Sequence, residues 1–270
     1  MKVILLTGAS SGIGKDTAKY LAKEGYKVYA GARRVNEMEE LKEFGIVPLS
    51  LDVTKEDSIK DAIDTIIQEE NRIDVLINNA GYGSYGAVED VTIDEAKAQF
   101  EVNLFGLAKL TKEVLPYMRQ QKSGRIINVA SMGGRLVSFM GAWYHATKYA
   151  VEAFSDALRM EVGQFGIDVS IIEPGGIKTN FGHIAADKLE NSAKGGAYES
   201  SAKKAADGMR KQYSGNMMSN PVVVSKAISK AVNSRRPRPR YLIGFGAKPL
   251  VFLKAVLPTR WFDYIMKNAS

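Results

Sequence analysis

Two side chains suited to acid–base chemistry, Tyr144 and Lys148, lie four positions apart near the middle of the chain. The surrounding segment, residues 142–165, has the apolar periodicity of a helix. Residues four apart share one helix face, so the phenol and the ammonium project in the same direction. A free tyrosine has a pKa of about 10 and is a poor proton donor at neutral pH. A cation fixed beside it would lower that pKa and make proton transfer practicable.

A tyrosine and a lysine with this spacing also occur in helices that have no catalytic role. The sequence at the N-terminus favours a catalytic role here, because it has the pattern of a dinucleotide-binding turn. An apolar run at residues 2–6 is typical of a buried parallel strand, and the glycine-rich stretch Thr7–Gly14 follows at once, where a helical pattern begins. Strand, glycine loop and helix in this order bind the pyrophosphate of a dinucleotide. Gly8 permits the tight turn, Gly12 lets the backbone approach phosphate, and Gly14 lets helix and strand pack closely. The first free N–H groups of the helix then face the phosphate.

These motifs belong to a larger set by which the chain resembles the short-chain dehydrogenase/reductase family. The resemblance covers residues 1–180. It is carried, in the order and spacing of the family, by Thr-Gly-x-x-x-Gly-x-Gly at residues 7–14, Asn78-Asn79-Ala80-Gly81, Asn103, Ser131, Tyr144-x-x-x-Lys148 and Pro174-Gly175.

The resemblance implies interconversion of a carbonyl and a secondary alcohol by hydride transfer. Tyr144 would donate the proton in reduction and accept it in oxidation, and Lys148 would lower its pKa and bind the nicotinamide ribose. Ser131 would bind the substrate oxygen and stabilise charge as it develops. Asn103 would bend its helix and hold a water that relays protons to Lys148.

The end of the second predicted strand indicates which nicotinamide cofactor would bind. An NAD site places an acidic residue here to accept hydrogen bonds from the ribose 2′-hydroxyl. The chain instead has Arg33 and Arg34, whose guanidinium groups match a phosphate in charge and geometry. We therefore predict NADP(H), with Arg33 as the principal ligand of the 2′-phosphate and Ser10 as an additional hydroxyl. Two surface arginines without this role are the alternative.

Further loops are expected to surround the cofactor. Asp52 resembles the family residue that accepts a hydrogen bond from the adenine amino group, or else it caps the next helix. Residues 174–179 should wrap the nicotinamide, with Thr179 placed for the carboxamide or the pyrophosphate. The predicted cofactor set is Gly8, Ser10, Ser11, Gly12, Ile13, Gly14, Arg33, Arg34, Asp52, Val53, Asn79, Ala80, Gly81, Tyr144, Lys148, Pro174, Gly175, Ile177 and Thr179.

Apolar strands alternate with helical segments and no linker interrupts them. This predicts one α/β domain over residues 1–270, a Rossmann-type doubly wound parallel sheet of about seven strands with helices on both faces. Strands are expected at 2–6, 26–31, 46–51, 73–77, 124–130, 167–173 and 239–244. Helices are expected at 12–24, 36–44, 55–70, 92–119, 142–165, 221–233, 249–257 and 260–267. The site motifs follow strand ends, where parallel sheets bind ligands.

The substrate is predicted to be bulky and apolar. Phe139 and Trp143, just before Tyr144, could line its pocket together with Phe181. Residues 180–220 are weakly periodic and rich in small residues, which indicates a mobile lid. The C-terminus resembles the hydroxysteroid-dehydrogenase-like branch of the family, so a hydroxysteroid or lipid ketone is expected. The alternative substrates are an acyl-glycerone-phosphate, a retinoid, or a small aldehyde or ketone. A different alternative is a non-catalytic regulatory protein that binds NADPH.

The net charge of +7 is concentrated in the last quarter of the chain. Between Gly208 and Phe262 there are eleven basic residues and no acidic one. Such a segment could attract an acidic substrate or an anionic membrane, or form a solvated face, whereas no motif for nucleic acid accompanies it. The basic and apolar extension at 245–270 could lie on a membrane surface. A core helix or a subunit contact is the favoured alternative.

Composition restricts the remaining possibilities. The chain has no cysteine and only two histidines, so disulfides and a histidine–cysteine zinc site are excluded and no metal is expected. His145 is expected to be structural. The first residues do not form a signal peptide and no apolar stretch approaches 20 residues, which favours a cytoplasmic protein. The family resemblance implies a homodimer or homotetramer that pairs helices 92–119 and 142–165.

Overall fold

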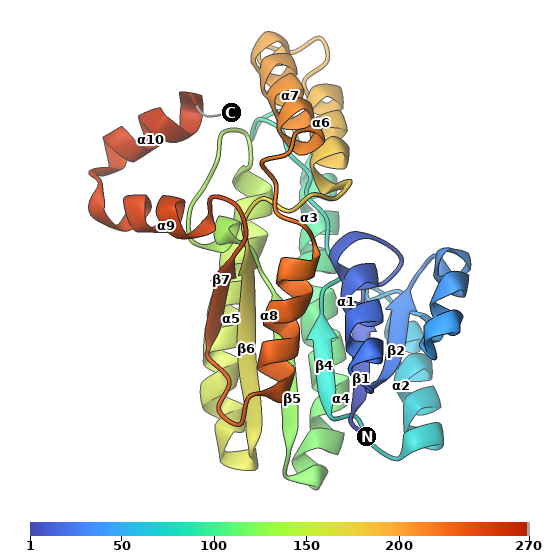
Figure 1. Cartoon of the computed structure of the whole chain (residues 1–270). Helices are drawn as coiled ribbons and strands as arrows, with labels where there is room; N and C mark the ends of the chain where they lie inside the picture. Colours follow the sequence, from blue (N-terminus) through green and yellow to red (C-terminus); the bar gives the residue numbers. More distant parts are fainter. Residues whose placement is uncertain (269–270) are drawn as a thin grey trace.

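The computed structural model describes residues 1–268 and contains a seven-stranded sheet in the order β3-β2-β1-β4-β5-β6-β7 (Figure 1). All neighbouring strands pair in parallel. The strands are β1 (Val3–Thr7), β2 (Lys27–Ala32), β3 (Val47–Ser50), β4 (Val75–Asn78), β5 (Gly124–Val129), β6 (Ile167–Pro174) and β7 (Arg240–Ile243). The predicted doubly wound parallel sheet is confirmed.

Helices connect the strands and cover both faces of the sheet. The α-helices are α1 (Gly12–Lys23), α2 (Glu56–Glu70), α3 (Ile93–Phe100), α4 (Leu107–Gln121), α5 (Ala142–Val162), α6 (Phe181–Ser192), α7 (Glu199–Ser214), α8 (Val222–Asn233), α9 (Ala247–Val256) and α10 (Thr259–Asn268). Short 3-10 helices span Val35–Phe44, Met132–Gly134 and Gly163–Phe165. In the described part of the chain, no helix is both long and apolar enough to cross a bilayer.

The two faces of the sheet bury alternate side chains of each strand. In β1, Ile4 and Leu6 pack with α1 and α8 in one core cluster. Val3 and Leu5 point to the other face, where α2, α4 and α5 cover them. Because both faces are covered, the strands are apolar at nearly every position, which is why short apolar runs predicted them.

The helix expected at 92–119 is interrupted. A π-helical segment, Glu101–Gly106, separates α3 from α4 and contains Asn103. Single π-helical turns are rare and cluster at functional sites. The apolar rhythm of the sequence continues through this turn, so periodicity alone predicted one long helix.

No helix was predicted within the proposed lid at 180–220, but α6 and α7 form a packed helical pair there, at the top of the molecule (Figure 1). Buried alanines such as Ala186 and Ala206 let the two helices approach closely. Gly182 lies directly against the ring of Tyr213. Small residues give only a weak apolar pattern in the sequence, although they allow the two helices to pack closely. This is why no helix was predicted in the segment 180–220.

The chain leaves the sheet after β7 and forms a C-terminal arm, residues 245–268, made of α9 and α10. Gly244 and Gly246, with φ of +87° and +72°, turn the chain out of the strand. A Cβ at Gly244 would lie 2.8 Å from Ile177, so the turn also packs closely against the loop after β6. The arm projects sideways from the body of the molecule (Figure 1).

Candidate active site

The glycine loop after β1 has the geometry of a phosphate-binding turn. Gly8 and Gly12 have φ of +70° and +54°, a region that disfavours other residues. A Cβ at Gly14 would lie 2.2 Å from the carbonyl oxygen of Gly8, so only glycine lets α1 start this close to the strand. The loop therefore leaves the N-terminus of α1 open toward a bound anion.

Thr7 and Asn79 join the glycine loop to the end of β4. The backbone N–H groups of Asn79 and Ala80 both donate to the Thr7 hydroxyl, each at 3.0 Å. The Asn79 side chain donates to the carbonyl oxygens of Thr7 and Gly8. These bonds cross the point between β1 and β4 where the strand order reverses, which is where such sheets bind ligands.

The end of β2 presents the two predicted arginines. Arg33 and Arg34 are both exposed and line the same cavity as the glycine loop. Arg34 forms an ion pair with Glu37 at 3.0 Å and donates to the Ser10 hydroxyl at 3.4 Å. Asp52 also lines the cavity, and it accepts from the backbone and hydroxyl of its neighbour two residues on. It does not cap α2, whose N-cap residue lies three positions later.

Tyr144 lies on the first turn of α5 and is only 6% exposed. The rings of Tyr85 and Phe181 lie 5.4 and 5.5 Å from its own. Burial raises the pKa of Tyr144 above its ordinary value, and a hydrogen bond with Ser131 opposes this in part. The net direction is opposite to the lowering that was predicted from Lys148, because loss of solvation outweighs the other influences on this pKa.

Lys148 is 7% exposed and points at the end of β5, where its ammonium donates to the carbonyl oxygen of Val129 at 3.0 Å. Burial lowers the pKa of Lys148 to about 8, while the negative charge of Glu152 one turn away works in the opposite direction. The side chain is thus a buried amine held in a fixed position one turn from Tyr144 on the same helix.

Ser131 follows β5 at the mouth of the next loop. Its hydroxyl accepts from the N–H of Gly133 at 3.0 Å and donates to the carbonyl oxygen of Pro174 at 3.3 Å. His145 holds the same loop from the other side, because its ring contacts the carbonyl oxygen of Gly133 and the N–H of Ser138, both at 2.9 Å. This histidine has a structural position.

Asn103 connects the π-helical segment to the loop after β4. Its amide oxygen accepts from the N–H of Tyr82 at 3.0 Å, and its amide nitrogen donates to the Tyr82 carbonyl oxygen and to the Thr147 hydroxyl. A Cβ at Gly81 would lie 3.0 Å from the Asn103 oxygen and 3.7 Å from the Lys148 nitrogen. Both side chains therefore approach Gly81, where a larger residue would crowd the Asn103 oxygen.

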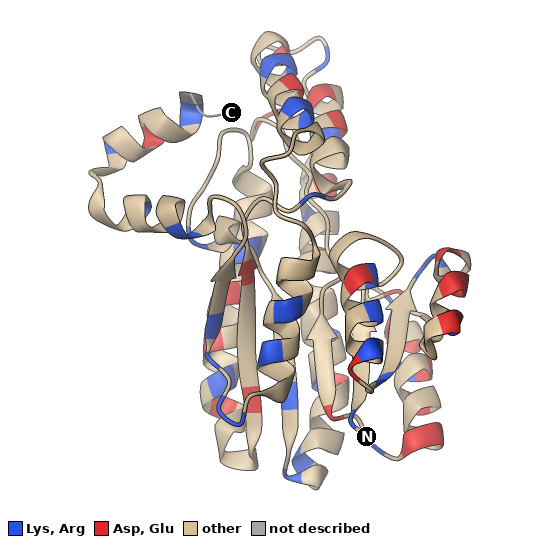
Figure 2. Ribbon diagram, in the orientation of Figure 1, with Lys and Arg blue, Asp and Glu red and all other residues tan. Residues whose placement is uncertain are grey.

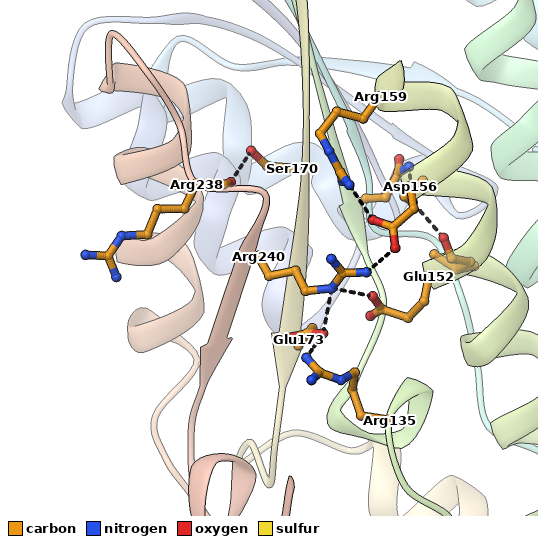
Figure 3. A network of polar contacts seen from close by, with 11 residues as sticks. Arg135, Glu152, Asp156, Arg159, Ser170, Glu173, Arg238 and Arg240 are labelled. Carbon is orange, nitrogen blue, oxygen red and sulfur yellow. Dashed lines mark hydrogen bonds and ion pairs between the residues drawn. The ribbon is translucent and has the colours of Figure 1, made fainter. Parts of the chain in front are cut away.

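An ionic network lies behind these residues and joins α5 to β6 and β7 (Figure 3). Arg240 of β7 contacts Glu152 at 3.1 Å, Glu173 at 3.5 Å and also Asp156. Arg135 contacts Glu173 at 3.2 Å. Glu152 and Glu173 are buried, and Glu173 immediately precedes the Pro174 loop. Sequence reasoning missed this network because its members are spread over about 100 residues of the chain.

One cavity of about 660 Å³ runs from the glycine loop past Tyr144 to α6 and the C-terminal arm. Every residue of the predicted cofactor set lies on its wall, as do Ser131 and Phe181. Asn103 lies behind the wall. A volume of this order suits an elongated ligand. The glycines that exclude side chains from the phosphate end, and the arginines beside them, fit a dinucleotide with a 2′-phosphate.

Two predicted substrate residues do not line this cavity. Trp143 lies in a separate hollow with Ile93 and Phe100 of α3 and Phe105 of the π-helical segment. Adjacent helix positions differ by about 100°, so Trp143 cannot share the face of Tyr144. Phe139 packs against the buried cluster that contains α6 and α7 instead.

The far end of the cavity contains residues that sequence reasoning did not select. Their shared feature is an apolar or phenolic side chain, contributed by the loop after β4 (Tyr85), by α6 and α7 (Ile184, Tyr213) and by the arm (Phe245, Leu250, Met266). The position of these side chains depends on how α6, α7 and the arm fold back over the sheet, and no local motif marks them.

Comparisons with known proteins agree with this geometry. A family model described as short chain dehydrogenase matches residues 2–190. The Helicobacter pylori protein named Probable short-chain type dehydrogenase/reductase VdlC is 36% identical over 265 residues, 97% of this chain and 96% of that protein. The 3-ketodihydrosphingosine reductase of Bacteroides thetaiotaomicron is 44% identical over 181 residues, 67% of this chain and 65% of that protein.

A solved structure described as the closed form of serine dehydrogenase complexed with NADP+ has a TM-score of 0.78 at 26% identity, and the match covers 90% of this chain and 94% of that one. The family model and the full-length relative together span the glycine loop, the Tyr144–Lys148 pair and the sheet that positions them. The chain is therefore an oxidoreductase of the short-chain dehydrogenase/reductase family.

Proposed function

We propose that the chain is an NADP(H)-dependent reductase that converts the carbonyl group of a bulky apolar substrate to a secondary alcohol, and catalyses the reverse reaction. The observation that carries this proposal is the position of Tyr144. It lies in one continuous cavity between the glycine loop and an apolar chamber, with Ser131 on the same cavity wall and Lys148 one turn away.

The preference for NADP(H) rests on Arg33 and Arg34 at the end of β2. Two exposed guanidinium groups at the cavity wall favour a 2′-phosphate over a bare ribose hydroxyl. Because Arg34 is already paired with Glu37, Arg33 is the principal ligand. The structural relative complexed with NADP+ supports this choice.

The residues at the centre of the cavity have distinct roles. The nicotinamide would supply the hydride. Ser131 binds the carbonyl oxygen of the substrate, and Tyr144 donates its phenolic proton to that oxygen as negative charge develops. Lys148 holds a positive charge near the phenol and binds the ribose, and Asn103 fixes the loop that contains Gly81 beside it.

An apolar substrate fits the walls beyond Tyr144. The chamber is lined by aromatic and aliphatic side chains such as Phe181, Ile184 and Leu250, with few polar groups to anchor a small polar molecule. The name of the Bacteroides relative denotes reduction of a keto group in 3-ketodihydrosphingosine. A lipid ketone or hydroxysteroid is therefore the proposed class.

The test is NADPH oxidation against a panel of steroid, long-chain lipid, retinoid and small aromatic ketones and aldehydes, with NADH in parallel. We expect turnover of at least one bulky apolar ketone and a clear preference for NADPH. Tight binding of NADPH, followed by fluorescence, without turnover of any panel member would favour a non-catalytic binding role. Turnover of small polar carbonyls alone would contradict the proposed substrate class.

A further inference from the structure

The outer face of the C-terminal arm exposes large apolar side chains. Phe252 on α9 is 65% exposed and Trp261 on α10 is 67% exposed. Val256, Tyr264 and Ile265 are exposed beside them. In α10 the positions 261, 264 and 265 share one helix face, so the exposed residues form an apolar side rather than scattered points. Large contiguous apolar surfaces of soluble proteins mark interaction sites.

The charge around this face is mainly positive. The arm carries Lys248, Lys254, Arg260 and Lys267 and one acidic residue, Asp263 (Figure 2). The other basic residues near the C-terminus do not add to it. The arginines of residues 235–238 precede β7, whereas the arm follows it, so these arginines and the arm lie at opposite ends of that strand.

The arm also forms part of the cavity. Leu250 of α9 and Met266 of α10 line it, and so does Phe245 at the start of the arm. Across the opening, Ile184 of α6 lines the cavity and is half exposed. Apolar side chains therefore continue from the inside of the cavity onto the outer surface of the arm.

We propose that this face of the arm docks on an anionic lipid bilayer and holds the cavity mouth at the membrane. Aromatic side chains such as Trp261 favour the headgroup level, and flanking lysines and arginines are attracted to anionic lipid. Each arm helix has ten residues, which suits a helix lying in the interface and not one crossing it.

Docking would have a direct consequence for the substrate. An apolar ketone could pass from the bilayer into the cavity between the arm and α6 without crossing bulk water. This delivery role rests on the proposed function, whereas the docking surface itself does not. The two can therefore be tested separately.

The test compares full-length wild-type protein with the double variant Phe252→Glu, Trp261→Glu in co-sedimentation with vesicles. One set of vesicles contains phosphatidylcholine alone and the other contains phosphatidylcholine with a third of phosphatidylglycerol. Val88→Glu is the matched control, because Val88 is equally exposed but lies in the loop before α3. None of the three positions lines the cavity.

We expect the wild type and Val88→Glu to sediment with the anionic vesicles, less so at high salt, and the double variant to bind them at least about tenfold more weakly. The emission of Trp261 should shift to shorter wavelength on binding, measured in a Trp143→Phe background. The wild type, the double variant and Val88→Glu should turn over the same apolar ketone of the panel alike, supplied in solution without vesicles, if the proposed function holds, because none of the changed positions lines the cavity.

Three results would overturn the docking proposal. The wild type could stay in the supernatant with anionic vesicles, or the double variant could sediment as well as the wild type. Alternatively, the double variant could have a lower mass in solution by sedimentation velocity, which would identify the arm as a contact between copies of the chain. Absence of turnover with normal vesicle binding would count against the proposed function alone.

Discussion

At the scale of single residues, the environment of Tyr144 favours the protonated phenol. Burial raises its pKa, and the hydrogen bond with Ser131 compensates only in part. The phenol is therefore protonated at neutral pH and has a proton to give to a developing alkoxide, which is a stronger base than a phenolate, although a raised pKa makes Tyr144 a weaker acid than a free tyrosine. Burial lowers the pKa of the neighbouring Lys148 to about 8, so its charge also depends on pH not far above neutrality.

Replacing Tyr144 with phenylalanine should reduce kcat by about a hundredfold or more, because the variant keeps the ring and loses only the transferable proton. The dissociation constant for NADPH should change little, as measured by fluorescence titration. Tyr149→Phe is the control, since Tyr149 lies on the same helix but is exposed. Substantial residual turnover in Tyr144→Phe would contradict the acid role.

Replacing Arg33 with alanine should raise the dissociation constant for NADPH by about tenfold or more and leave that for NADH nearly unchanged. The physical reason is the loss of a charged contact to a phosphate that NADH does not have. Arg34→Ala should have a smaller effect, because this side chain is already paired with Glu37. Equal weakening for both cofactors in Arg33→Ala would disprove the phosphate contact.

At the scale of elements, the ionic network of Figure 3 ties the edge strand β7 to α5. Arg240 is the shared partner of Glu152 and Glu173. Burial and the nearby charge of Glu173 raise the pKa of Glu152 to about 8, although Arg240 acts in the opposite direction. Within residues 1–268, one carboxylate oxygen of Glu152 and one of Glu173 have no hydrogen-bond partner. A proton shared between the two carboxylates would reduce their mutual repulsion.

This pKa predicts a pH-dependent stability. Between the unfolded value of about 4.5 and the folded value of about 8, the folded chain retains a proton on Glu152 that the unfolded chain has lost. Stability should therefore fall as pH rises through this interval. In the variant Glu152→Gln, Tm should decrease less with increasing pH than in the wild type. Glu161→Gln is the control and should not change this dependence, because Glu161 is exposed on the same helix. A curve for Glu152→Gln as steep as that of the wild type would contradict the assigned pKa.

The elements that local pattern determines were predicted well. The glycine loop could be predicted because its backbone angles favour glycine and so leave a sequence motif. The strands could be predicted because burial on both faces of the sheet makes them continuous apolar runs. The π-helical turn at Asn103 was not predicted, because it depends on bonds to Tyr82 and Thr147 that only the folded chain brings together. Trp143 was assigned to the pocket because it is next to Tyr144 in the sequence. Adjacent residues of a helix point in directions about 100° apart, so the two side chains lie on different faces of α5.

At the scale of the whole molecule, the outer face of α4 and α5 is the candidate contact between copies of the chain. Tyr149 and Met160 are exposed about three turns apart on α5, so they share a face. Phe105 is also half exposed and lines the hollow that contains Trp143. Family members are commonly oligomers, and this surface suits the predicted homodimer or homotetramer.

Phe105→Glu combined with Met160→Glu should lower the mass in solution, because two buried charges without partners would oppose association. Sedimentation velocity gives the measurement, and Val88→Glu, on an unrelated loop, is the control. An unchanged mass in the double variant would exclude α4 and α5 as the contact.

The order of the parts along the chain has a consequence for engineering. The groups proposed to carry out hydride and proton transfer all precede residue 180, whereas the lid helices α6 and α7 and the arm, which shape the apolar chamber, all follow it. Short connections join β6 to α6, α7 to α8 and β7 to α9. Grafting residues 181–214 and the arm of another family member onto this sheet should therefore exchange the accepted ketone while the cofactor preference is retained.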